Sequence, residues 1–494
     1  MSIRCVAAGP VPSPFRSVRA LVRHGPSCNL SPMTGSVTLP VWLFVLILAF
    51  AAVTFASHFL FPSVRWFFRR RLERAVAQLN TRLERPIQPF KLLRRYDLIQ
   101  RLCYDPEVTR AIVDHAHRTG VREDVAFEEA RRYAREIVPS FSASLYFGVA
   151  IRLARALSNA LYRVRLVRHD HEALSAIDPD ATVVFVMNHR SNMDYVLVTH
   201  LAADSSALSY AVGEWAQVWP LSRLIRAMGA YFIHRRTRND LYRRVLERYV
   251  HLATVNGVTQ AIFPEGGLSL DGGTAPPRLG LLKYLVDGAE EGERDVVFVP
   301  VALNYDRVLE DRILTRALKR GGRRFDARIG VVAGFALRHL WRRVTGRYHK
   351  FGYASVSFGS PLSWNNWTGA RTPEALGDEI MSRIGDVVPV LPVPLVAHLL
   401  LAKGPMTRGE IELGFTAVLR ALERPVAHVP RGHRDYAVEV GLRTLTTRGL
   451  VIEEDGVYRI AEDETDLLKF YAKSIAHLVA EDSVPPDLSA LARS

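Results

Sequence analysis

Short runs of β-branched and apolar residues alternate with helical stretches through the middle of this chain, and this alternation is the strongest constraint on its fold. The runs cover residues 182–187, 259–263 and 296–301, and a helical pattern covers residues 240–255. Alternating strands and helices are typical of an α/β layer with a largely buried sheet. Ligands of such sheets bind at the carboxyl ends of the strands. We therefore predict a mixed sheet flanked by helices over residues 161–393, with a catalytic site at its strand ends.

Different patterns flank this region. Residues 65–160 carry apolar and charged residues at helical spacing, and Asp105 followed by Pro106 marks a helix start. We predict a helical bundle there. Residues 394–480 combine two helical stretches with a hairpin that turns at Asp455-Gly456. This order predicts a small winged-helix-like α+β domain, and we expect a flexible tail to follow it over residues 481–494.

The N-terminal part contains a long uncharged segment. Residues 37–61 include no Lys, Arg, Asp or Glu. At about 1.5 Å per residue, a helix of this length crosses a hydrocarbon core of about 30 Å. We predict a transmembrane or membrane-anchoring helix, with the arginines that follow it on the cytoplasmic side of the inner or plasma membrane. A signal peptide is disfavoured, because the apolar run is long and begins far from Met1. Residues 1–36 are predicted to be a disordered lead, and translation from Met33 is an alternative.

The charge of the chain restricts its partners. The formal net charge is +15, which favours anionic partners, and we expect anionic membrane lipid first because an apolar segment is present. A basic soluble protein is the alternative. Cys5, Cys28 and Cys103 are widely spaced, so neither a disulfide framework nor a zinc site is indicated. We expect no metal.

The motif Asn188-His-Arg-Ser-Asn-Met-Asp194 directly follows an apolar strand. On one continuous helix, His189 and Asp194 would point about 140° apart. The two side chains therefore meet only if His189 lies in the turn and Asp194 reaches back from the first helical turn. Asp194 would then fix the imidazole tautomer and leave the other nitrogen as a general base. The alternative is a histidine at a strand end beside a helix-start aspartate.

Three more motifs end strands. Arg235 and Arg236 follow an apolar strand and could bind a phosphate as a fork, although a solvated basic strand end has the same composition. Glu265-Gly-Gly267 allows close backbone approach to an anion, although most such motifs are ordinary turns. Residues 299–307 are an apolar strand whose Pro300 could line a groove, or an ordinary core strand with a polar end.

These four motifs together resemble the glycerol-3-phosphate acyltransferase family, within the glycerophospholipid acyltransferases with a His-x-x-x-x-Asp motif. The likeness covers about residues 80–480. It implies acyl transfer from acyl-CoA or acyl-carrier protein to the 1-hydroxyl of glycerol 3-phosphate in phospholipid biosynthesis, without an organic cofactor. His189 and Asp194 then take the catalytic roles. The resemblance further implies that Arg235 and Arg236 bind the acceptor phosphate and that Glu265 and Gly266 build its pocket. From the residues themselves, we expect Gly267 to belong to the same substrate-binding turn and Pro300 to line the acyl groove.

The chain departs from the family pattern near the expected phosphate site. His234 stands where the family strand usually continues into its first arginine. Leu268 and Leu270 stand where arginines usually follow the Glu-Gly turn. A lost charge-assisted contact costs about 1.5–3 kcal/mol, so we expect compensation from Arg278 and Lys283.

Alternative functions follow from these departures and from the charge. Lysophosphatidate or dihydroxyacetone phosphate could replace glycerol 3-phosphate as the acceptor. A membrane-tethered DNA-binding regulator is a different class, suggested by the winged-helix outline. It is disfavoured because the helix over residues 436–448 offers few side chains for base edges, and we expect no nucleic acid as partner. A catalytically inactive scaffold is disfavoured by the intact His189 and Asp194.

Overall fold

The computed structural model describes residues 40–167, 171–201, 206–213, 221–234, 239–291, 293–321, 350–422 and 434–479. The chain divides into two compact units, Met1–Arg71 and Leu72–Ser494. The second unit contains the predicted helical region, the sheet and the C-terminal helices. The predicted domain boundaries within this unit stay predictions.

Helix α1 contains most of the segment that we predicted to cross a membrane. It runs from Val41 to Asn80 and so continues beyond residue 61, through an arginine-rich stretch of good helix formers. Across the ranges given above, no helix has both the length and the apolar character needed to span a membrane. The predicted transmembrane helix is therefore not supported. The predicted lead over residues 1–36 lies outside the described residues.

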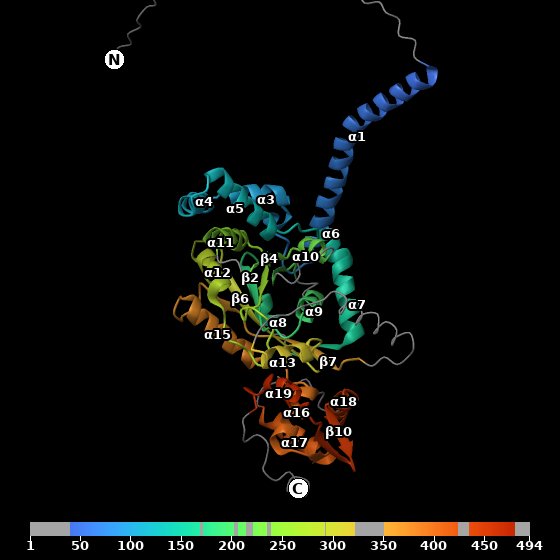
Figure 1. Cartoon of the computed structure of the whole chain (residues 1–494), viewed down its shortest axis with the longest axis vertical. Coiled ribbons are helices and arrows are strands. Elements are labelled where there is room, and N and C mark those ends of the chain that lie inside the picture. Colours follow the sequence, from blue (N-terminus) through green and yellow to red (C-terminus); the bar gives the residue numbers. More distant parts are fainter. Residues whose placement is uncertain are drawn as a thin grey trace, which may run out of the picture. The chain divides into compact units, whose positions relative to one another are not determined.

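An eight-stranded mixed sheet forms the centre of the second unit (Figure 1). Its strand order is β1-β7-β6-β2-β5-β3-β4, and β8 pairs with β6. Strands β6, β2, β5, β3 and β4 run parallel, whereas β7 and β8 run antiparallel to β6. The strands are β1 (Arg163–Leu166), β2 (Thr182–Met187), β3 (Ser209–Gly213), β4 (Tyr231–Ile233), β5 (Gln260–Ile262), β6 (Val296–Tyr305), β7 (Tyr353–Phe358) and β8 (Leu362–Ser363). This arrangement confirms the predicted α/β sheet.

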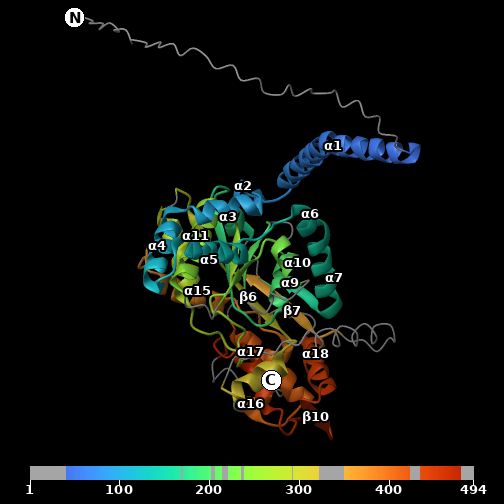
Figure 2. The ribbon, with the colours of Figure 1, turned by 45° about the horizontal axis from the view of Figure 1, so that its top comes forward.

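Helices cover both faces of this sheet, because side chains along a strand alternate between its faces. In β2, Val183, Phe185 and Met187 pack into one apolar core with α9, α16, α18 and α19. Val184 and Val186 pack into a second core with α3, α4, α5, α11, α12 and α15. Figures 1 and 2 show α4, α5 and α11 together on that second side. The predicted helix over residues 240–255 is α11.

The bounds of the remaining elements follow the chain. The lead-in comprises α2 (Pro89–Leu92), α3 (Arg95–Cys103), α4 (Pro106–Thr119), α5 (Glu123–Ile137), α6 (Ala143–Leu145), η1 (Tyr146–Ala150) and α7 (Ile151–Leu161). The sheet region adds α8 (His171–Ser175), α9 (Met193–Leu201), α10 (Leu221–Ala227), α11 (Asp240–Val255), α12 (Leu279–Glu291), α13 (Asp311–Lys319) and α15 (Pro373–Asp386). As predicted, Asp105 caps α4, with its Oδ1 accepting from the Glu107 backbone N–H at 2.9 Å.

The C-terminal part contains the predicted helices and hairpin. The elements are α16 (Pro392–Lys403), β9 (Met406–Thr407), α17 (Arg408–Ala421), α18 (Arg434–Thr447), β10 (Val451–Glu454), β11 (Val457–Ile460) and α19 (Thr465–Lys473). The hairpin turns at Asp455 and Gly456, whose φ angles of 50° and 78° are both positive, as a type I′ turn requires. The two helices and the hairpin are as predicted, but the assignment to the winged-helix class is not supported.

Asp306 fixes three elements at the edge of the sheet where β6 ends. Its Oδ2 accepts from the Tyr353 backbone N–H at 2.7 Å, and its Oδ1 accepts from the Val393 backbone N–H at 2.9 Å. Burial raises the pKa of Asp306 to about 7. Gly352 is required beside it, because an added Cβ would lie 2.6 Å from the Asp306 side chain. The end of β6, the start of β7 and the start of α16 are therefore held together.

Candidate active site

The loop that follows β2 carries the predicted catalytic pair. Asn188 continues the β2–β6 contact with its side chain, since its Oδ1 accepts from the Leu303 N–H at 2.8 Å and its Nδ2 donates to the Leu303 carbonyl at 3.0 Å. The backbone is thereby free to turn, and His189 lies in that turn while Asp194 lies in the first turn of α9. This is the geometry that the five-residue spacing required.

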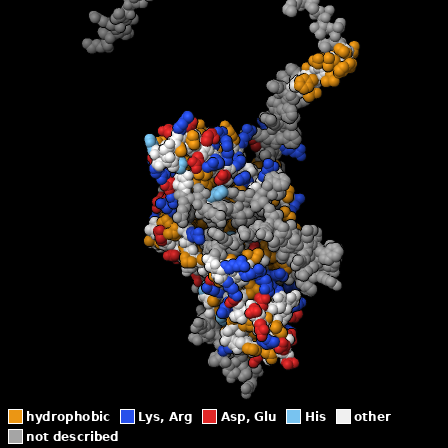
Figure 3. All heavy atoms as spheres, viewed as in Figure 1, with side chains coloured by type: hydrophobic (Ala, Val, Ile, Leu, Met, Phe, Trp, Pro, Cys, Tyr) orange, Lys and Arg blue, Asp and Glu red, His pale blue; other side chains and the backbone are white. Residues whose placement is uncertain are grey.

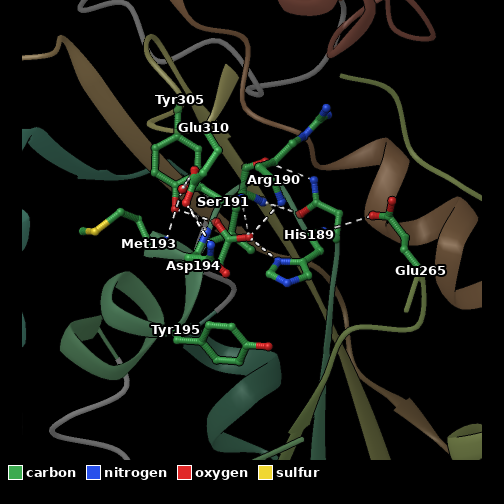
Figure 4. A network of polar contacts seen from close by, with 12 residues as sticks. His189, Arg190, Ser191, Met193, Asp194, Tyr195, Glu265, Tyr305 and Glu310 are labelled. Atoms are coloured by element: carbon green, nitrogen blue, oxygen red, sulfur yellow. Dashed lines mark hydrogen bonds and ion pairs between the residues drawn. The ribbon is translucent and has the colours of Figure 1, made fainter. Parts of the chain in front are cut away.

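Asp194 is the centre of a fully buried polar network (Figure 4). Its Oδ2 lies 2.8 Å from Nδ1 of His189 and also accepts from the backbone N–H groups of Arg190 at 2.8 Å and Ser191 at 3.0 Å. Its Oδ1 accepts from the hydroxyl of Tyr305 at 2.6 Å. Because the carboxylate acts only as an acceptor, Nδ1 of His189 carries the proton and Nε2 is left with a free lone pair.

The neighbouring aromatic rings restrict the imidazole further. The His189 ring stacks on Phe263, with centroids 4.1 Å apart, and meets the edge of Tyr195 at 5.5 Å. Burial, and then the charge of Asp194, raise the pKa of Tyr305 well above its ordinary value, so its hydroxyl remains a donor. The imidazole therefore has one orientation, set by a ring below it and a carboxylate beside it.

Glu310 holds the same loop from the other side. Its Oε2 accepts from the Ser191 hydroxyl at 2.7 Å, and its Oε1 accepts from the backbone and side-chain amides of Asn192 at 3.2 and 3.0 Å. Burial raises the pKa of Glu310. The sequence did not identify Tyr305 or Glu310 as part of the site. Both lie at or just beyond the end of β6, which is the signal that could have indicated them.

Glu265 supports the loop rather than pairing with an arginine. Its Oε1 accepts from the His189 N–H at 3.0 Å, and its Oε2 accepts from the Ala275 N–H at 3.1 Å. Burial raises the pKa of Glu265, and the nearby Arg190 opposes that shift. Glu265 therefore joins the loop after β2 to the turn that follows β5.

Gly266 makes room for Arg278. Gly266 has a φ of 66°, and an added Cβ would lie 2.4 Å from Cδ of Arg278. Both residues line a cavity of about 140 Å³ together with His189, at the carboxyl ends of β3, β4 and β5. The buried Gly267 continues the same turn. Arg278 therefore lies beside the cavity that His189 lines, and its role as a compensating cation stays a prediction.

Other predicted residues lie elsewhere. Lys283 is exposed on α12, near Glu247, and does not line the His189 cavity. Pro300 is buried within β6 and faces Gly359, which lies in the gap between β7 and β8. A Cβ added to Gly359 would contact the Cβ of Pro300. That gap tolerates a residue without an N–H, so the position of Pro300 has a structural explanation. Arg235 and Arg236 lie outside the described residues.

The departures from the family pattern have structural causes. Leu268 and Leu270 are partly buried and pack against the core that contains Val183, Phe185 and Met187 of β2. Apolar side chains therefore suit these positions. His234 lies 3.1 Å from Oε2 of Glu136 on α5, which ties the end of β4 to the helical lead-in.

An apolar cavity of about 280 Å³ adjoins the His189 cavity, and Tyr195 and Val212 line both. Its other walls come from α7, η1, α9 and α10 and include Leu153, Leu224 and Met228. A long apolar group could occupy this cavity while its end reaches His189.

The chain is similar to known acyltransferases. The Acyltransferase family model matches residues 166–304, and the model for the glycerol-3-phosphate acyltransferase C-terminal region matches residues 338–485. Curated glycerol-3-phosphate acyltransferases are similar to this chain. The protein of Aeromonas hydrophila is 27% identical over 434 residues, covering 80% of this chain and 51% of the relative. The protein of Pseudomonas putida is 28% identical over 426 residues, covering 78% and 49%.

The chain spans about half the length of the curated relatives it matches. A solved structure, that of the 1-acyl-sn-glycerophosphate acyltransferase PlsC from Thermotoga maritima, covers 48% of this chain and 76% of its own chain. It is 18% identical to this chain, with a TM-score of 0.32.

The tautomer of His189 is directly measurable. We expect the nitrogen chemical shifts of the neutral imidazole to show a protonated Nδ1 and an unprotonated Nε2, because the carboxylate of Asp194 accepts from Nδ1. Asp194→Asn should abolish this preference, since an amide can donate as well as accept. The signal is assigned among the 16 histidines by its loss in His189→Gln. A neutral ring with Nε2 protonated in the unsubstituted protein would contradict the geometry.

Proposed function

This chain belongs to the glycerol-3-phosphate acyltransferase family, and on that premise we propose that it transfers an acyl group from a thioester donor to the 1-hydroxyl of glycerol 3-phosphate. The observation that carries the proposal is the contact between Nδ1 of His189 and Asp194 at 2.8 Å beside a cavity. A buried imidazole with a fixed tautomer and a free Nε2 is the arrangement that general base catalysis needs.

In the proposed mechanism, Nε2 of His189 removes the proton of the acceptor hydroxyl as its oxygen attacks the thioester carbonyl carbon. The C–O bond forms and the carbonyl electrons move to oxygen. The tetrahedral intermediate then collapses, the C–S bond breaks, and the thiolate takes the proton from the imidazolium. Asp194 stabilises the imidazolium that exists between these steps. General base catalysis of this kind contributes about 10²–10⁴ in rate.

The acceptor phosphate is proposed to bind at the turn after β5. Arg278 lies across Gly266 beside the His189 cavity, and a guanidinium matches the geometry of a phosphate. Glu265 and Gly267 shape this turn. Arg235 and Arg236, which follow the cavity-lining strand β4, stay in the proposal on the sequence motif alone.

The acyl chain is proposed to occupy the apolar cavity between α7, α9 and α10 rather than a groove at Pro300. This cavity shares Tyr195 and Val212 with the cavity that His189 lines, so a thioester at His189 could direct its alkyl chain there. Each buried methylene contributes about 0.8 kcal/mol, which is enough to select chain length.

Two further points extend the proposal. The net charge of +15 supports activity at an anionic membrane surface, which we place on the cytoplasmic side. The proposed donor is acyl-CoA or acyl-carrier protein, and the proposed pathway is phospholipid biosynthesis.

Leu268 and Leu270 replace arginines of the family pattern. Lysophosphatidate and dihydroxyacetone phosphate therefore remain the second candidate acceptors.

Acceptor screening tests the reaction. With hexadecanoyl-CoA as donor, we expect the purified protein to acylate glycerol 3-phosphate with a higher kcat/KM than lysophosphatidate or dihydroxyacetone phosphate. His189→Gln should lower kcat by about 10²–10⁴ or more, because the general base is lost. His117→Gln, on the exposed side of α4, is the matched control. Higher kcat/KM for another acceptor would replace glycerol 3-phosphate in the proposal, and full activity of His189→Gln would reject the mechanism.

Arg278 and Lys283 can be separated by matched substitutions, since both are exposed and were predicted together. Arg278→Gln should raise the KM for the acceptor about 10-fold, because a charge-assisted contact is lost, and should leave the KM for the donor unchanged. Lys283→Gln should change neither value. Steady-state kinetics with each substrate varied in turn measure the effect. An equal response of the two variants would show that the phosphate does not bind at this turn.

Substitution in the apolar cavity should change the preference for donor length. Leu153→Trp narrows the cavity from an exposed position on α7, so the ratio of kcat/KM for octadecanoyl-CoA to dodecanoyl-CoA should fall at least about fourfold, the value of one buried methylene. Leu93→Trp, at a similarly exposed position far along the chain, is the control. If both variants keep the ratio of the unsubstituted protein, the acyl chain lies elsewhere.

A further inference from the structure

A second cavity, of about 440 Å³, lies away from His189 between the end of β6, the start of β7 and α18. Its volume is in the range of small-molecule sites. Among the described residues that line it there are five cations and no carboxylate. The cations are Arg163, Arg307, Lys350, Arg443 and Arg448. Figure 3 shows Lys and Arg side chains gathered at the level where α13 and β7 are labelled in Figure 1.

Arg307 is the central cation of this cavity. It follows the end of β6 and is half-buried, with its guanidinium carbon 4.2 Å from the centre of the Phe351 ring. No hydrogen bond joins its guanidinium to a carboxylate within the parts of the chain that the structure describes. Burial, followed by the neighbouring charge of Arg448, lowers the pKa of Arg307. A half-buried cation beside a like charge is costly unless an anion compensates it.

Two of the other cations, Arg448 and Arg163, are held in place by neighbouring side chains. Arg448 donates to Oδ2 of Asp311 at 2.5 Å and to the hydroxyl of Tyr471 at 2.8 Å, so its position is fixed without a ligand. The Arg163 guanidinium lies 5.8 Å from the ring of Tyr353 and 5.6 Å from the ring of Tyr436. Asp311 thus compensates Arg448, and the five cations that line the cavity leave it with an excess of positive charge.

The position of the cavity is that of a ligand site. Arg307 lies two residues after Tyr305, whose hydroxyl holds Asp194, and Gly352 of the cavity directly precedes β7. The cavity therefore lies at the same edge of the sheet as the His189 site. The cavity is near β6, β7 and β1, whereas the His189 site is near β2, β5 and β3. Ligands of α/β sheets bind at this edge.

We propose that this cavity binds an organic phosphate, whose oxygens are held by the guanidinium groups of Arg307 and Arg448 and by the cations at the rim. Arginine binds phosphate through two parallel hydrogen bonds, and several arginines around one hollow suit a ligand with more than one negative charge. The same chemistry is offered by the nucleotide end of a CoA-type molecule, by a lipid phosphate and by free phosphate. The assignment does not depend on the proposed reaction.

Isothermal titration calorimetry on the full chain tests the proposal at about 0.15 M salt. The probes are adenosine 3′,5′-bisphosphate, dihexanoyl phosphatidate and inorganic phosphate, and the tightest binder identifies the source of the phosphate. Lys350→Gln with Arg443→Gln removes the rim charges without touching a buried residue. Arg307→Gln removes the central charge, and its fold is checked by circular dichroism. Lys403→Gln with Arg420→Gln removes the same number of exposed charges from the C-terminal helices as a control.

We expect the Kd of the tightest probe to rise at least about 10-fold in Arg307→Gln, and to rise in the rim variant, while the control binds like the unsubstituted protein. His189→Gln should also bind normally, which separates this site from the catalytic cavity. The proposal is overturned if none of the probes binds with a Kd below about 1 mM, or if Arg307→Gln and the rim variant both bind like the control.

Discussion

The carboxylate of Asp194 is the contact on which the rest of the site depends. It accepts from the imidazole of His189, from two backbone N–H groups of the loop after β2, and from the hydroxyl of Tyr305 at the end of β6. One buried anion thus fixes a tautomer, a loop conformation and the distance between two strands. Because every contact is made by a donor, the charge is compensated without an ion pair to a lysine or arginine of the described ranges, and Nε2 of the imidazole is left unprotonated.

Two more carboxylates accept hydrogen bonds from this loop, and further hydrogen bonds connect it to distant parts of the chain. The carboxylates of Glu265, which is buried, and of Glu310, which is half-buried, accept from backbone or side-chain groups of residues 189–192. Arg190 donates from Nη2 to the Ser474 carbonyl at 3.2 Å, and Asn304 donates to the Ser474 hydroxyl at 3.1 Å. The C-terminal region, which the model for the glycerol-3-phosphate acyltransferase C-terminal region matches, therefore contacts the loop after β2 directly.

Much of this arrangement could be predicted from the sequence, because its signals are local. Strand β2, helix α11, the hairpin turn and the placement of His189 before a helix-start Asp194 all follow from patterns within a few residues. Tyr305 and Glu310 could not be assigned in this way, since they contact the loop across 111 and 119 residues of chain. The inward packing of Leu268 and Leu270, and the separation of Lys283 from the cavity, likewise depend on tertiary contacts that no short motif encodes.

The central proposal is that Nε2 of His189 is the base that receives the proton of the acceptor hydroxyl. A crystal structure with glycerol 3-phosphate and a non-reactive thioether analogue of acyl-CoA would test it most directly. We expect the 1-hydroxyl oxygen to lie about 2.6–3.2 Å from Nε2, with the phosphate toward Arg278. An acceptor bound with this hydroxyl out of reach of the imidazole, in a complex where both ligands are ordered, would contradict the account.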